Sequence, residues 1–76
     1  MGRRSAADDL LARCEAARNE GSDFPTIWVS ILRTSPLVIG LPTHDVRDGK
    51  ALIVIKLAEG RELLSSITGF SLGRSD

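Results

Sequence analysis

Residues 48–57 read Asp-Gly-Lys-Ala-Leu-Ile-Val-Ile-Lys-Leu, and this stretch decides the fold. The aliphatic run after the Asp-Gly pair is rich in β-branched residues, which favour strands. Another β-rich stretch, 37–47, precedes the pair. Asp-Gly between two such stretches is typical of a type I′ turn, because both central residues of that turn need positive φ. The sequence therefore predicts an antiparallel β-hairpin with Asp48 and Gly49 at its turn.

This turn sets which residues of the two strands face each other. The predicted pairs are Arg47 with Lys50, Val46 with Ala51, His44 with Ile53, Pro42 with Ile55 and Gly40 with Leu57. Facing residues lie on the same side of a sheet. The side expected to face the core carries Val38, Val46, Ala51, Ile53, Ile55 and Leu57. The opposite side carries Leu37, Ile39, Leu41, Thr43, Asp45, Leu52, Val54 and Lys56.

The opposite side is more apolar than a sheet face in contact with water, where apolar and polar residues usually alternate. Contiguous exposed apolar surface marks interaction sites. The sequence therefore predicts a docking surface for a protein partner, in the simplest case a second copy of the chain. The residues predicted to form it are Ile39, Leu41, Leu52, Val54 and Lys56. The alternative is that Phe70, Leu72 or the first helix covers this side within one chain.

The pattern after the hairpin has two interpretations. Residues 58–61 fit a turn, and 62–67 fit a third strand that would extend the hairpin into a meander. Leu63, Leu64 and Ile67 also have helical spacing, and Gly69 could end a short helix there. We expect the strand, because a two-stranded ribbon is marginally stable alone and a third strand would protect it.

The N-terminal part of the chain predicts two helices. Ser5 and Asp8 fit a capping box, and apolar residues then recur at helical spacing, so we expect the first helix over about 6–20. Asp23 and Pro25 fit the start of a second helix. Its broad apolar face comprises Phe24, Ile27, Trp28, Ile31 and Leu32. The alternation of β-branched residues over 27–31 also fits a strand, but we expect the helix, ending at 35–36.

Together these elements predict an α+β fold, in which two N-terminal helices pack on an antiparallel β-hairpin or three-stranded meander. Seventy-six residues are enough for one small domain, 1–76. We expect its ordered core to cover about 5–70, with frayed tails at 1–4 and 73–76.

The composition narrows the class of protein. Ten basic and ten acidic residues give a formal net charge of zero, so no overall field attracts nucleic acid or an anionic membrane. No apolar run approaches the roughly 18 residues of a membrane span. A single cysteine cannot form an intrachain disulfide. We therefore expect a cytoplasmic protein with no membrane partner.

The sequence carries no pattern for catalysis, cofactor binding or metal binding. His44 and Asp45 are adjacent, but neighbouring strand residues point to opposite faces, so Asp45 cannot orient His44 as a catalytic base. Cys14 lies in the apolar stripe of the first helix, which favours a packing role. One histidine and one cysteine do not make a zinc site. We expect no enzymatic activity, no cofactor and no metal.

The sequence thus favours a small non-catalytic protein–protein interaction module or accessory subunit. We expect it to self-associate, most simply as a homodimer, through the apolar side of the sheet. An alternative is a nucleic-acid-associated regulatory protein, whose candidate contacts are Arg3, Arg4, Arg13 and Arg18. A third possibility is a small-ligand carrier with a pocket around Trp28, between the second helix and the sheet.

Overall fold

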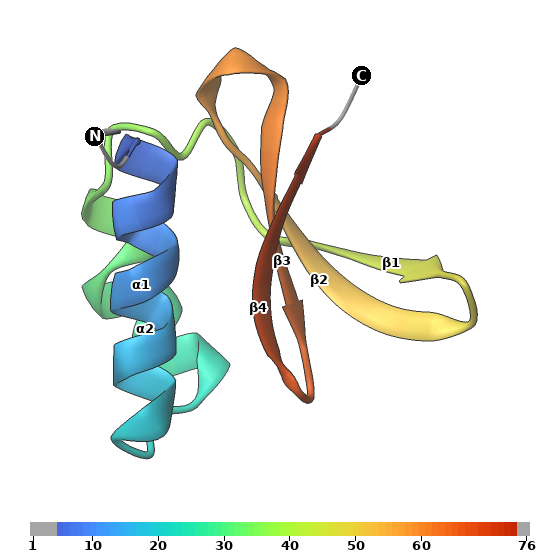
Figure 1. The fold of residues 1–76 in the computed structure, drawn as a ribbon, viewed down its shortest axis with the longest axis horizontal. Coiled ribbons are helices and arrows are strands. Elements are labelled where there is room, and N and C mark those ends of the chain that lie inside the picture. Colours follow the sequence, from blue (N-terminus) through green and yellow to red (C-terminus); the bar gives the residue numbers. More distant parts are fainter. Residues whose placement is uncertain (1–4, 75–76) are drawn as a thin grey trace, which may run out of the picture.

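The computed structural model describes residues 5–74 and has an α+β fold, with two helices and a four-stranded antiparallel sheet (Figure 1). The helical elements are α1 (Ala6–Asn19), α2 (Phe24–Ser30) and the short 3₁₀ turns η1 (Leu32–Thr34) and η2 (Ala58–Gly60). The strands are β1 (Thr43–Arg47), β2 (Lys50–Lys56), β3 (Arg61–Ser66) and β4 (Gly69–Arg74), in the order β1-β2-β3-β4. The predicted fold class is confirmed, but the sheet has one strand more than the three-stranded meander.

The predicted tails fall partly outside the described residues. Residues 1–4 and 75–76 lie outside them. Gly73 and Arg74, which we expected to be frayed, belong to β4 and pair with Glu62 and Arg61 of β3. The ordered part of the chain therefore runs further toward the C-terminus than the predicted 5–70.

α1 begins at the predicted capping box. The amide of Asp8 donates to Ser5 Oγ at 3.1 Å, and the amide of Ser5 donates to Asp8 Oδ2 at 3.3 Å. At the other end, Gly21 has a φ of 98° and its amide donates to Arg18 O. The amide that follows donates to Ala17 O. These two bonds form a Schellman motif, which ends the helix.

α2 begins at Asp23, whose carboxylate accepts the amide of Thr26 at 3.0 Å, and the predicted helix is thereby confirmed over the alternative strand. It is shorter than the apolar pattern suggests, because the backbone of Ile31 leaves helical geometry and the chain continues as η1. The apolar face nevertheless stays together. Ile27 and Leu32 are buried, and Phe24, Trp28 and Ile31 pack against the core.

The hairpin turn and its register are as predicted near the turn. Asp48 and Gly49 have φ of 53° and 74°, the positive values that a type I′ turn requires. The strand pairs run from Arg47 opposite Lys50 to Thr43 opposite Val54. The local sequence therefore determined both the turn and which side chains share a face.

The predicted register fails further from the turn. Val38, and not Gly40, lies opposite Leu57. Between the Thr43–Val54 pair and this one, the first strand uses five residue steps and β2 uses three. The two extra residues bulge out of the ladder, and Val38 can then pack against the core while Leu41 is exposed.

β4 was not predicted from the sequence. Its sequence, Gly-Phe-Ser-Leu-Gly-Arg, contains two glycines, and glycine is unfavourable in strands. Phe70 and Leu72 alone carry the apolar alternation. Both pack into the core, where α1 lies against β4, so tertiary burial outweighs the weak local preference.

Both helices cover the same face of the sheet, named the inner face (Figure 1). The inner face carries His44, Val46, Ala51, Ile53, Ile55, Leu63, Ser65, Phe70 and Leu72. The buried core consists of Ala7, Leu10, Cys14, Ile27, Leu32, Ile55, Leu57, Leu63 and Phe70. β1 and the start of β2 extend beyond the helices, so Val46 and Ala51 are exposed despite lying on the inner face.

Phe70→Ala tests whether β4 is an integral part of the domain. Phe70 is buried, and truncating a buried aromatic costs about 3–5 kcal/mol, a large share of the roughly 5–15 kcal/mol that holds a native domain together. We expect a loss of this size in urea unfolding followed by far-UV circular dichroism. The matched control is Ile67→Ala in the adjoining turn, where the side chain is 91% exposed and the expected change is within about 0.5 kcal/mol. Equal effects of the two substitutions would contradict the assignment of β4.

Candidate interaction surface

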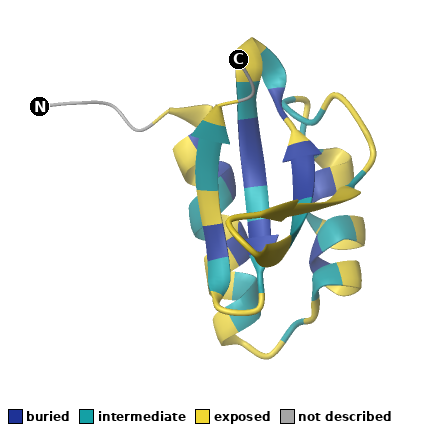
Figure 2. Cartoon of the chain, turned by 90° about the vertical axis from the view of Figure 1, so that its right-hand side faces the viewer, coloured by how far each residue is buried: buried dark blue, intermediate teal, exposed yellow. Residues whose placement is uncertain are grey.

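The face of the sheet away from the helices, named the outer face, has no second layer of secondary structure among residues 5–74. The residues on this face include Thr43, Asp45, Arg47, Lys50, Leu52, Val54, Lys56, Glu62, Leu64, Ser66, Ser71 and Gly73. Figure 1 shows the β1–β2 hairpin projecting from the sheet on the side away from the helices, and Figure 2 views the molecule from that side.

The residues predicted to dock a partner differ in their accessibility. Ile39 and Leu41 are 65% and 78% exposed, and Lys56 is also exposed. Leu52 is half-buried, and Val54 is 3% exposed. Ile39 and Lys56 lie side by side, because the amide of Ile39 donates to Lys56 O at 3.0 Å. The accessible part of the predicted surface is thus the segment 39–41 together with the adjoining end of β2.

Val54 is buried on the outer face and does not belong to the core beneath the helices. It pairs with Thr43 on one side and with Leu64 on the other. Phe70 and Leu72, the residues that the sequence offered as possible cover for this side, both point to the inner face and pack against the core.

An ion pair ties the tip of the hairpin to β3. The guanidinium of Arg47 donates from Nη1 to Glu62 Oε1 at 2.8 Å and from Nη2 to Glu62 Oε2 at 3.2 Å. Its Nε donates to Asp45 Oδ2 at 2.8 Å. Such two-pronged arginine–carboxylate bonds are shorter and stronger than bonds between neutral groups. Glu62 is 3% exposed, so this carboxylate is buried and charged, with Arg47 as its partner.

The pKa values of Glu62, Asp45 and Arg47 are shifted by these hydrogen bonds. The bonds from Arg47 lower the pKa of Glu62 and that of Asp45. The same carboxylates, Glu62 first, raise the pKa of Arg47. The pair between Arg47 and Glu62 could not be predicted from the sequence, because the two residues are 15 positions apart and no local pattern links them. What the hairpin register could have predicted is that Asp45 and Arg47 lie on the same face of the sheet.

Asp45 also binds the edge of the sheet. The pair next to a type I′ turn exchanges both ladder bonds and the pairs then alternate, so the backbone groups of Val46 point away from β2. The amide of Val46 donates to Asp45 Oδ1 at 2.8 Å. One of the outward-facing donors of this edge strand, the amide of Val46, is therefore already bound.

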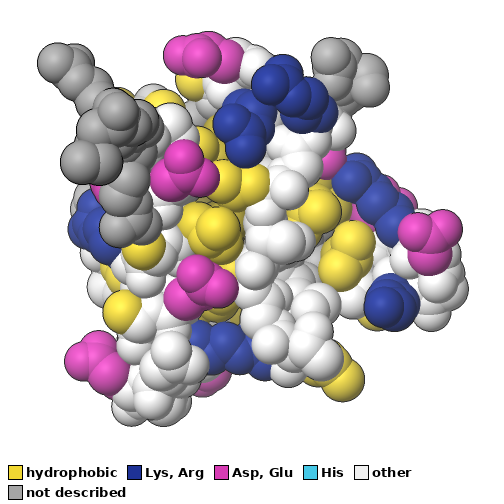
Figure 3. Space-filling model, in the orientation of Figure 1, with side chains coloured by type: hydrophobic (Ala, Val, Ile, Leu, Met, Phe, Trp, Pro, Cys, Tyr) yellow, Lys and Arg dark blue, Asp and Glu magenta, His cyan; other side chains and the backbone are white. Residues whose placement is uncertain are grey.

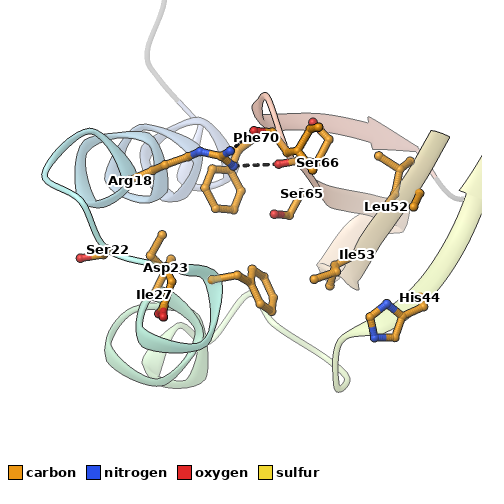
Figure 4. A pocket seen from close by; sticks show the side chains of 13 residues that line it. Arg18, Ser22, Asp23, Ile27, His44, Leu52, Ile53, Ser65, Ser66 and Phe70 are labelled. Atoms are coloured by element: carbon orange, nitrogen blue, oxygen red, sulfur yellow. Dashed lines mark hydrogen bonds between the residues drawn. The ribbon is translucent and has the colours of Figure 1, made fainter.

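An open groove of about 540 Å³ lies between the C-terminal end of α1, the start of α2 and the hairpin (Figure 4). It is lined by Arg18, Ser22, Asp23, Phe24, Ile27, His44, Ala51, Leu52, Ile53, Ser65, Ser66, Ile67 and Phe70. Trp28 is not in this lining, so the groove is not the pocket around Trp28 that the sequence suggested. Its charged groups already have partners, since the Asp23 carboxylate caps α2 and Arg18 binds the β3–β4 turn.

The arginines proposed for nucleic-acid binding do not form one described patch. Arg18 donates to Ser66 O at 2.7 Å and to Ile67 O, and its guanidinium lies 6.0 Å from the centre of the Phe70 ring. It therefore joins α1 to the β3–β4 turn. Arg13 is exposed, about 140° round the helix axis from Arg18. Residues 3 and 4 lie outside the described part of the chain.

The side chains that were candidates for catalysis or metal binding do not form a common site. Asp45 binds Arg47 and the Val46 amide, so it does not orient the exposed His44. Cys14 is buried, and burial raises the pKa of its thiol to about 11. Among residues 5–74, no group of three potential metal-ligating side chains comes together, and no helix is long and apolar enough to cross a membrane.

Comparisons of the chain with known protein families, with characterised proteins and with solved structures find no match. Evidence for function therefore comes from the surface of the chain itself. Among residues 5–74, the exposed large apolar side chains are Val29, Ile39, Leu41, Val46 and Ile67. Figure 3 adds that hydrophobic side chains reach the surface at the base of the projecting hairpin, with charged side chains toward its tip.

Cys14 offers a test of the packing role. At pH 8 a thiol with a pKa of about 11 is ionised in about one molecule in a thousand, and this side chain is also fully buried. We expect native protein not to react with a thiol-specific disulfide reagent within minutes, and urea-unfolded protein to react stoichiometrically. Rapid stoichiometric labelling of the native protein would contradict a buried, inert cysteine.

Proposed function

We propose that the chain is a small, non-catalytic protein–protein interaction module that self-associates, with the segment 39–41 and Lys56 as its docking surface. The observation that carries the proposal is the exposure of two large aliphatic side chains, Ile39 and Leu41, beside the end of β2. Exposed apolar side chains that lie together mark interaction sites more often than isolated ones do.

The backbone conformation at 39–41 favours a role as a docking surface. Ile39 is fixed by its amide bond to Lys56 O, and Leu41 is presented by the two-residue bulge before β1. Gly40, between them, has no atom within 4 Å of the position where a side chain would begin, so the surface at this point is open. A partner would meet apolar groups held by the sheet.

A second copy of the chain is the partner that we propose. The net charge of zero means that two copies do not repel each other at long range. Around a buried aliphatic contact, Lys56 would supply a polar rim: its stem can cover apolar surface while its charge stays in water. The same surface could also serve an accessory subunit that binds a different protein.

The double substitution Ile39→Ser/Leu41→Ser tests the surface. Burying an aliphatic side chain contributes about 1.5–3 kcal/mol, and about 1.4 kcal/mol corresponds to a tenfold change in affinity. We therefore expect the Kd for self-association, measured by sedimentation equilibrium, to rise at least about tenfold. Far-UV circular dichroism should stay unchanged, because neither side chain belongs to the core.

Val29→Ser is the matched control, since Val29 is another exposed aliphatic residue but lies on α2. Its Kd should equal that of the original chain. A monomeric mass for the original chain at high micromolar concentration would overturn self-association. An equal loss of affinity in the control would overturn the assignment of the surface.

A further inference from the structure

We infer that the groove between the C-terminal end of α1, the start of α2 and the β1–β2 hairpin binds a small, uncharged aromatic molecule with one hydrogen-bonding group. This inference goes beyond the proposed self-association and does not depend on it, because the segment 39–41 does not line the groove.

The floor of the groove is a row of inner-face residues that runs across all four strands. His44, Ile53, Ser65 and Phe70 are successive partners in the strand pairings, so their side chains lie next to each other on this face. All four residues line the groove. The segment 22–24 and Ile27 line it from the helical side. The site is thus built from parts of the chain that are far apart in sequence.

Ser65 supplies a polar group in the middle of this apolar floor. It is 5% exposed, and Figure 4 shows its side chain pointing into the space between Phe70 and Ile27. No other group among residues 5–74 forms a hydrogen bond with its hydroxyl, whereas every fully enclosed side-chain oxygen or nitrogen in this part of the chain has a partner. The hydroxyl therefore opens into the groove, where it can donate to a ligand or accept from it.

The charged groups at the groove are engaged within the chain. Arg18 donates to the carbonyl oxygens of Ser66 and Ile67. The Asp23 carboxylate accepts the amide of Thr26. A charged ligand would have to displace one of these bonds or stay without a partner of opposite charge, which is costly away from water. The groove therefore favours an uncharged ligand.

The size and the walls of the groove fit a single ring-containing molecule. Its volume of about 540 Å³ lies within the range of about 300–1,000 Å³ that is typical of small-molecule sites. Phe24 and Phe70 offer aromatic surface, against which another ring can pack edge-to-face or offset, and Ile27 and Ile53 add aliphatic surface. A polar substituent on the ring would take the place of water at Ser65.

NMR titrations of the ¹⁵N-labelled chain with phenol and with toluene test the site. The two probes have the same number of heavy atoms, but phenol alone carries a hydroxyl. We expect phenol to bind with a Kd of about 1 mM, as is usual for so small a ligand. It should shift the amide signals of 52–53 and 65–67 and leave those of 39–41 in place. Toluene should bind about fivefold more weakly, because it leaves the Ser65 hydroxyl without a partner.

Three variants locate the interaction. Ser65→Ala removes the hydroxyl, so the Kd for phenol should rise about fivefold and the Kd for toluene should stay the same. Ser71→Ala is the matched control, an exposed serine on the outer face of β4, and it should change neither Kd. Ala51→Phe fills the groove from an exposed position outside the core, so it should abolish binding of both probes.

The absence of a saturable shift with phenol up to about 10 mM, well above the expected Kd, would overturn the binding site. Undiminished binding of phenol by Ala51→Phe would place the ligand elsewhere and overturn it too. Equal Kd values for phenol and toluene, or an unchanged Kd for phenol in Ser65→Ala, would overturn the assigned class of ligand. If Ser65→Ala does not fold, the comparison of the two probes on the original chain decides the same point. The effect of Ile39→Ser/Leu41→Ser on self-association judges the proposed function separately.

Discussion

The burial of one face of the sheet beneath α1 and α2 is the constraint on which the rest of the structure depends. Ile55, Leu57, Leu63 and Phe70 are buried there, and they fix the middle of the sheet against the helices. A chain of 76 residues has enough helix for one such layer. The opposite face has no such layer among residues 5–74, and it carries charged residues such as Asp45, Lys56 and Glu62 beside the apolar Leu52, Val54 and Leu64.

In the sheet, some features follow from neighbouring residues in the sequence and others depend on tertiary packing. The Asp-Gly turn and the register near it follow from residues next to each other in sequence, and the predicted pairs from Arg47–Lys50 to His44–Ile53 are correct. The bulge before β1 and the fourth strand depend on what packs against them. Gly69 and Gly73 weaken the local β signal, and the contact of Phe70 with the helices could not be read from spacing alone.

The candidate site shows the same limit. The sequence predicted which side of the hairpin carries Ile39, Leu41, Leu52, Val54 and Lys56, but accessibility depends on where the hairpin lies in space. Arg47, near the tip of the hairpin, binds Glu62 of β3, 15 residues further along the chain. Val54 is buried, whereas Ile39 and Leu41 are exposed. A buried charged pair of this kind has no signature in composition or periodicity.

The bond between Asp45 and the Val46 amide has a consequence for how copies of the chain can meet. An edge strand with free backbone donors is a template for adding strands from other molecules, the route to cross-β aggregation. Here the outward donor of Val46 is occupied, and Asp45 and Arg47 place charges along the same short strand. Growth of the sheet beyond β1 at Val46 would require that bond to break and those charges to lose water. The strand is therefore a poor template for adding a further strand at this point.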